Sequence, residues 1–263
     1  MPDLELIGID EIGHKDFVVI VSGLTAQGQK FILAVLPDRK KETVKTFLKA
    51  LPPRQYNSIR RVCIDMNEGY CNAAQETLAN AQVVVDRFHV AKQYRDCADQ
   101  ARKAEMKRLK QTLPESDYAQ LKGAMWAFRK PWSALTEEQE VVLLRLFEQA
   151  PILKEVYVQR EVLTNIFETH QSKAQAELAL TQWLNRITDL GLKCFSSFVT
   201  TLDNWLDEIT NYFIRRETSG FVEGLNNKIK VIKRHCYGIY NLGRLFQHIW
   251  LDVQGRRVLF AEH

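Results

Sequence analysis

The first 86 residues alternate short hydrophobic strands with helices, and this order limits the possible folds more than any other feature of the sequence. The expected strands are residues 6–9, 17–21, 31–36, 59–64 and 82–85, and the expected helices are residues 40–51 and 71–78. Tight turns join the first three strands, whereas helices lead to the last two. This order predicts an α/β fold in which a mixed sheet carries helices on its faces.

The sequence from about residue 90 to 216 has helical periodicity throughout and no credible strand. Its expected helices are residues 90–112, 137–149, 152–168, 173–190 and 195–215. Thr136 and Gln139 form a predicted capping box, and Gly191 fits a helix C-terminus. Four tryptophans are interpreted as packing anchors, with DNA stacking as the alternative. They are Trp126, Trp132, Trp183 and Trp205.

Two more amphipathic helices are expected after this block, over residues 220–234 and 241–253. We therefore expect three segments along the chain: the first part of the sheet domain over 1–90, an all-helical insertion over 91–216, and the last part of the sheet domain over 217–263. The insertion would then interrupt the sheet domain before its last functional helix.

The composition is that of a globular protein, with 46% hydrophobic and 26% charged residues among 263. A net charge of +4 is compatible with a nucleic-acid partner but does not require one. The five cysteines include no C-x-x-C pair, which argues against a disulfide framework and a zinc ribbon within this chain. No apolar run reaches membrane-spanning length and the start lacks a signal-peptide pattern, so a cytoplasmic location is expected.

Asp10 and Asp65 follow the first and fourth expected strands. In an open sheet, side chains at strand ends converge on a crevice. Carboxylates brought together repel each other unless a cation lies between them or one of them binds a proton. Oxygen ligands of this kind suit Mg²⁺ or Mn²⁺. The two aspartates therefore predict part of a divalent-cation site.

Each of these aspartates has an alternative interpretation. Asp10 is also a candidate turn residue at a strand end, and Glu11 or Asp3 is a candidate for its role. Asp65 is also a candidate cap of the following helix. Asp86 competes with Asp65, because it follows a strand as well.

The expected helix over residues 220–234 places Glu223 near its start, with cations behind it. A solvated polar face is the simpler interpretation. The alternative is that Glu223 joins Asp10 and Asp65 in a site for two metal ions about 3.5–4 Å apart, which activate a water or a 3′-hydroxyl and stabilise the leaving oxygen of a phosphodiester. The polar residues behind Glu223 would then contact the phosphate backbone. They are Asn227, Lys228, Lys230, Lys233 and Arg234.

Four blocks, IGIDE, VCIDMNEGY, VVVDRFHVAK and FVEGLNNKIKVIKRHCYGIYN, resemble those of insertion-sequence transposases of the ISL-three family. The resemblance is collinear over the whole chain. It implies an RNase H-like DDE enzyme in which Asp10, Asp65 and Glu223 bind two Mg²⁺ or Mn²⁺ ions. The run from Asp86 to His89 resembles a motif of Cys or Asp, two other residues and His that follows the second aspartate in related transposases, and this favours Asp65 over Asp86.

Two residues after the fifth strand keep open roles. His89 either orients the aspartates or contacts DNA, and the alternative is a structural pair with Asp86. Lys92 either reaches a phosphate or faces water.

The resemblance implies cleavage of DNA at transposon ends and transfer of the freed strand to target DNA. It also implies a homodimer or a higher assembly, without a membrane partner. Two alternatives are an RNase H-like nuclease without strand transfer and a truncated, non-catalytic DNA-binding remnant. The zinc ribbon and helix-turn-helix of the family are expected to be missing from this chain, which begins at the first catalytic strand, so a shortened and inactive form is also considered.

Overall fold

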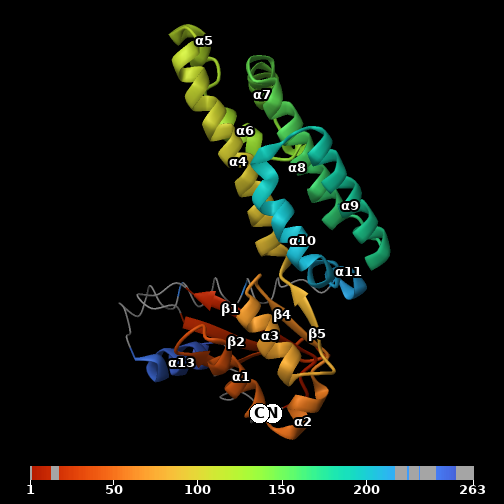
Figure 1. Ribbon diagram of the computed structural model, residues 1–263. Helices are drawn as coiled ribbons and strands as arrows, with labels where there is room; N and C mark the ends of the chain where they lie inside the picture. The colour runs from red at the N-terminus through yellow and green to blue at the C-terminus, as the bar shows by residue number, and fades with distance from the viewer. Residues whose placement is uncertain (1, 13–17, 217–223, 225–230, 232–240, 253–263) are drawn as a thin grey trace. The chain divides into compact units, whose positions relative to one another are not determined.

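The structure is a computed structural model that describes residues 2–12, 18–216, 224, 231 and 241–252 (Figure 1). The chain divides into two compact units, one formed by Met1–Arg87 with Arg215–His263 and the other by Phe88–Ile214. Within the described ranges, none of the helices combines the length and the hydropathy of a membrane span. The three-segment division expected from the sequence, with boundaries after residues 90 and 216, stays a prediction.

The first unit contains a five-stranded sheet in the order β3-β2-β1-β4-β5. The strands are β1 Leu6–Ile12, β2 Val18–Leu24, β3 Lys30–Leu36, β4 Arg61–Ile64 and β5 Gln82–Val85. Strands β1, β2 and β3 pair antiparallel, whereas β4 and β5 continue the sheet parallel to β1. The mixed, RNase H-like sheet expected from the sequence is therefore confirmed.

The sheet unit also contains helices, most of which bury apolar side chains. They are α1 Lys41–Lys49, α2 Pro53–Ser58, α3 Glu68–Thr77 and α13 Leu242–Trp250. Leu245 and Ile249 of α13 are buried in one cluster with Ile20 of β2 and Ile32 of β3. Figure 1 shows α13, in blue, beside this part of the sheet. The C-terminal helix is thus part of the sheet unit.

Four of the five strands differ from their predicted bounds, and the difference in β1 concerns the candidate site. Strand β1 continues to Ile12, so Asp10 lies within it and not after its end. The physical reason is that β1 has two different neighbours. Its pairing with β4 ends at Ile9, whereas its pairing with β2 continues past Asp10, which is opposite Ile20.

The second unit is all-helical in the residues that the structure describes. Its elements are α4 Arg87–Thr112, α5 Glu115–Ala119, α6 Ala124–Arg129, η1 Trp132–Ala134, α7 Glu137–Gln149, α8 Pro151–Glu168, α9 Lys173–Asp189, η2 Lys193–Phe195, α10 Ser196–Thr210 and α11 Tyr212–Arg215. The predicted capping box of Thr136 and Gln139 is present. Gly191 follows α9 with φ 62°, a left-handed conformation that suits glycine.

Aromatic side chains fill the centre of the helical unit. Tyr94, Phe167, Phe195 and Phe198 are fully buried, and the Trp183 ring lies 5.7 Å from that of Phe198. The packing role predicted for Trp183 is therefore confirmed. It is wrong for Trp126, which is 62% exposed on the short helix α6, with the Arg129 guanidinium 6.0 Å from its ring.

Candidate active site

Three aspartates lie level with one another, directly after the last paired residues of three adjacent parallel strands. The last residue pair between β1 and β4 is Ile9 with Ile64, and the last pair between β4 and β5 is Ile64 with Val85. The residues that follow these three are Asp10, Asp65 and Asp86. The Asp86 amide donates to the Ile64 carbonyl at 2.7 Å, which holds it at this level. Neighbouring strands lie roughly 4.8 Å apart. Because β4 lies between β1 and β5, Asp65 lies between the other two aspartates.

The strand register places Cys63 and the three aspartates on one side of the sheet. Cys63 is two residues before Asp65 and therefore points to the same face. Burial raises the pKa of the Cys63 thiol, and the negative charges of Asp86, Asp10 and Asp65 raise it further. Cys63 therefore lies on the side of the sheet that carries the three aspartates, and burial is the main cause of its raised pKa.

The oxygen ligands gathered here suit Mg²⁺ or Mn²⁺ better than zinc. Asp10 and Asp65 are both partly exposed, whereas one carboxylate oxygen of Asp65, Oδ1, is buried. Carboxylates alone are the ligands that hard divalent cations prefer. Among the described residues, no three His, Cys, Asp or Glu side chains have the geometry of a complete metal site.

Glu11 points away from this face and has partners of its own. Its carboxylate accepts a hydrogen bond from the Tyr70 hydroxyl at 2.8 Å, and Arg39 lies 3.9 Å from its other oxygen. Asp3 is bound to Arg54 at 2.6 Å, three residues before β1 begins. The three candidates for the first acidic position are Asp10, Glu11 and Asp3. Of these three, only Asp10 lies on the face of β1 that continues to Asp65.

Asp65 does not cap the helix that follows it. The Asn67 side chain occupies the N-cap of α3 and accepts hydrogen bonds from Gly69 N at 2.9 Å and Tyr70 N at 3.3 Å. The cap interpretation of Asp65 is therefore wrong. Asp65 therefore lies before the helix and on the face of the sheet that it shares with Asp10.

The residues after β5 start the long helix α4. Asp86 is only 6% exposed and directly precedes Arg87, the first helical residue. His89, expected before the helix, lies in its first turn, with its ring 5.8 Å from that of Phe88. Lys92 is exposed and pairs with Asp96 at 2.7 Å, which leaves both of its predicted roles open. The roles predicted for Asp86 and His89 stay predictions.

The remaining predicted site residues lie outside the described part of the chain. They are Glu223, Asn227, Lys228, Lys230, Lys233 and Arg234. Within residues 220–234, only Gly224 and Val231 are described, and both are helical and exposed. The distance from Glu223 to the aspartates therefore stays a prediction.

Two features of this site were not predicted from the sequence. Cys63 could have been found by strand alternation, because it is two residues from Asp65. Asn67 could have been recognised as a cap, because asparagine favours the position before a helix. By contrast, the contact between Tyr70 and Glu11 joins residues 59 positions apart and has no local signal.

Comparison with known proteins agrees with the geometry of the sheet. A family model described as a transposase, of the ISL-three type, matches residues 7–249. The chain is 30% identical over 240 residues to the transposase for insertion sequence element IS1001 of Bordetella parapertussis, covering 89% of this chain and 57% of that protein. It is 22% identical over 274 residues to the transposase for IS1557 of Mycobacterium tuberculosis, covering 97% and 61%.

The chain spans about three fifths of the length of these relatives. The family model, in contrast, covers nearly all of this chain, from β1 to α13. An RNase H-like sheet with level aspartates directly after the paired residues of its parallel strands, together with this match, shows that the chain belongs to the ISL-three family of DDE transposases.

Proposed function

We propose that this chain is the catalytic part of an insertion-sequence transposase that cleaves DNA at the element's ends and joins the freed 3′-hydroxyl to target DNA. Asp10, Asp65 and Glu223 would hold two divalent cations. The observation that carries the proposal is the level placement of Asp10 and Asp65 on one face of neighbouring parallel strands.

Two bound divalent ions supply activation of the attacking oxygen and stabilisation of the leaving one. The chain's own residues would hold the ions and orient the DNA. Asp10 and Asp65 are fixed by strand pairing on β1 and β4, so their separation changes little during a reaction. Cations after Glu223 would bind the phosphates flanking the cleaved bond. Asp86 and His89 would position the second aspartate or the DNA.

The described residues on both sides of Glu223 belong to the sheet unit, which supports its inclusion. Arg215 pairs with Glu5 at 2.5 Å, eight positions before Glu223. Helix α13 begins at Leu242 and packs on Ile20, the residue opposite Asp10 and therefore on the same face of the sheet. Eight residues reach at most roughly 29 Å, which is enough to bring residue 223 to that face.

Cleavage of a supercoiled plasmid carrying the element's own ends tests the triad. Asp10→Asn, Asp65→Asn and Glu223→Gln should each reduce Mg²⁺-dependent nicking by more than about 100-fold, since even changed outer-shell partners of a metal cost up to that much. Asp203→Asn and Glu148→Gln make the same chemical changes at exposed positions of α10 and α7 and should leave nicking unchanged. Full activity in any one of the triad variants would reject that residue's assignment.

The other functions give different results in the same system. A plain nuclease would nick the plasmid but would not join pre-cleaved ends to a second DNA. A non-catalytic remnant would bind DNA without nicking it, and calorimetry would detect no Mg²⁺ binding. Assembly into a dimer or a higher oligomer on paired ends is part of the proposal, and light scattering of the DNA complex measures it.

A further inference from the structure

The net positive charge of helix α4 exceeds the net charge of the whole chain. It contains eight Lys and Arg against three Asp and Glu, a net charge of 8 − 3 = +5, whereas the whole chain has +4. Helix α7 has one Arg against four Glu, 1 − 4 = −3, and α10 has three acidic residues and no Lys or Arg, 0 − 3 = −3. Positive charge in the helical unit is therefore concentrated on one helix.

Four lysines of α4 lie on one side of it, and we name them the lysine face: Lys92, Lys103, Lys107 and Lys110. At 100° per residue their directions fall within about 60° of one another. All four are exposed, whereas Val90, Tyr94 and Leu109 point into the unit. From Lys92 to Lys110 the face runs 18 residues, roughly 27 Å, which approaches the roughly 34 Å of one turn of duplex DNA.

Acidic partners do not neutralise this face. Lys92 pairs with Asp96, but both side chains are more than half exposed, and such surface pairs contribute little free energy. Lys103 is 3.3 Å from Asp99. Lys107 and Lys110 have no acidic partner among the described residues.

Asp99 is already neutralised by arginines. Arg102 and Arg129 reach its carboxylate at 2.8 and 2.7 Å. Burial alone would raise the pKa of Asp99, but the hydrogen bonds from Arg129 and Arg102 outweigh it and hold the pKa well below its usual range. Lys103 is therefore available to another anion without leaving Asp99 unpaired.

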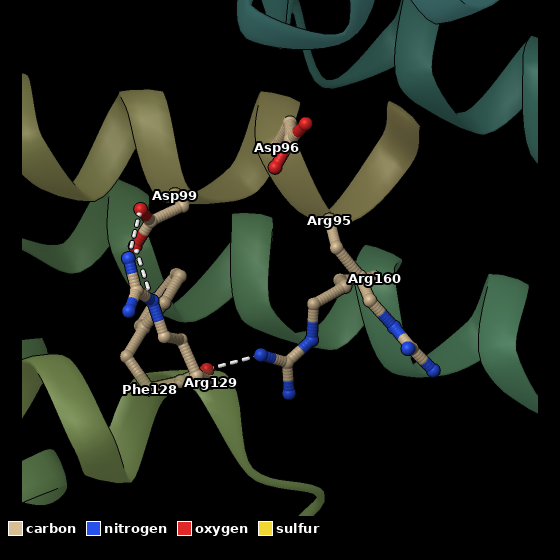
Figure 2. Close-up of a pocket in the computed structure, with 6 residues that line it drawn as sticks. All are labelled: Arg95, Asp96, Asp99, Phe128, Arg129 and Arg160. Carbon is tan, nitrogen blue, oxygen red and sulfur yellow. Dashed lines mark hydrogen bonds and ion pairs between the residues drawn. The ribbon is translucent and has the colours of Figure 1, made fainter. Parts of the chain in front are cut away.

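A pocket of about 290 Å³ lies beside the lysine face, and three arginines are among the residues that line it (Figure 2). Two of its three arginines are used by the fold, since Arg129 binds Asp99 and Arg160 donates to the Lys130 carbonyl at 2.8 Å. The third, Arg95, is exposed. Figure 2 shows its side chain extending away from Asp96 and Asp99. Arg95 thus widens the positive surface of α4.

We propose that the lysine face of α4, together with Arg95, binds the phosphodiester backbone of duplex DNA. The inference rests on the proposed function for the presence of DNA, and adds that the helical unit holds the duplex through α4. Lysines and arginines without base-reading partners give binding that is independent of sequence and weakens steeply with salt.

Fluorescence anisotropy of the full chain with a labelled duplex of arbitrary sequence, in EDTA, tests this without requiring cleavage. The triple variant Lys103→Gln, Lys107→Gln, Lys110→Gln removes three phosphate contacts. At about 0.9 per contact, the slope of log affinity against log salt should become shallower by about 2.7. The matched control, Arg145→Gln, Arg186→Gln, Lys193→Gln, removes the same charge from exposed positions of α7, α9 and η2 and should keep the wild-type slope.

An unchanged slope in the lysine variant, or an equal change in the control, would overturn the proposal. Circular dichroism of both variants confirms that the helices persist. The result is independent of the metal site, because Asp65→Asn should lose cleavage but keep the wild-type salt slope. Failure of this inference is therefore distinguishable from failure of the proposed function.

Discussion

Replacing Ile249 with alanine tests whether α13 is a structural layer of the sheet unit. Ile249 is fully buried in the cluster with Ile20, Ile32 and Leu245. The change removes three carbon groups, which at about 0.8 kcal/mol each gives a transfer cost of roughly 2.4 kcal/mol. A cavity in a close-packed cluster adds to this, so we expect a loss of about 2.5–5 kcal/mol.

Hydrogen exchange of the β2 and β3 amides is the assay, because a chain of two units need not unfold in one step. The control is Leu251→Ala, at a residue that directly follows α13 and is 56% exposed, where we expect a change within about 0.5 kcal/mol. If Ile249→Ala shifts exchange no more than Leu251→Ala does, α13 does not contribute to the stability of the sheet and the support for placing residue 223 near Asp10 is lost.

Three further predictions concern single side chains. Tyr70→Phe removes the hydrogen bond to Glu11 in a buried position and should cost about 1–3 kcal/mol in urea unfolding, whereas Tyr118→Phe on α5 should cost little. The pKa of Asp99 is lower in the folded state than in the unfolded state, so its contribution to stability is present above the unfolded pKa and is lost as the pH falls through the folded pKa. Asp99→Asn should therefore flatten the acid side of a plot of unfolding free energy against pH. An unchanged plot would contradict the pairing of Asp99 with arginines. Cys63 should resist alkylation by iodoacetamide in the native protein at pH 8, because burial and three carboxylates keep its thiol protonated, and rapid labelling would contradict their placement.

The sheet was predictable because its strands are short apolar runs, and the segments between them are recognisable as tight turns or helices. The level placement of Asp10, Asp65 and Asp86 follows from the register of β1, β4 and β5, which the sequence does not specify. The extension of β1 through Asp10 depends on β2, a partner whose pairing is tertiary. Position along the chain therefore selected the candidate aspartates, whereas strand pairing determines that they lie level with one another.

The short helices of the second unit were missed for a different reason. Segments α5, α6 and η1 are three to six residues long, so local propensity is too weak to distinguish them from turns. In the sheet unit, α2 is absent from the predicted helices, although it begins at Pro53 and proline suits the first position of a helix. Long amphipathic helices such as α8 needed no tertiary information.

The two aspartates alone do not make a two-metal site, and the account depends on where Glu223 lies. The most direct measurement is an anomalous difference map from a crystal of this chain soaked in Mn²⁺. We predict two peaks roughly 3.5–4 Å apart, bound by the carboxylates of Asp10, Asp65 and Glu223. A map in which manganese contacts the aspartates while the Glu223 carboxylate lies more than about 10 Å from both ions would contradict the claim that these three residues form one site.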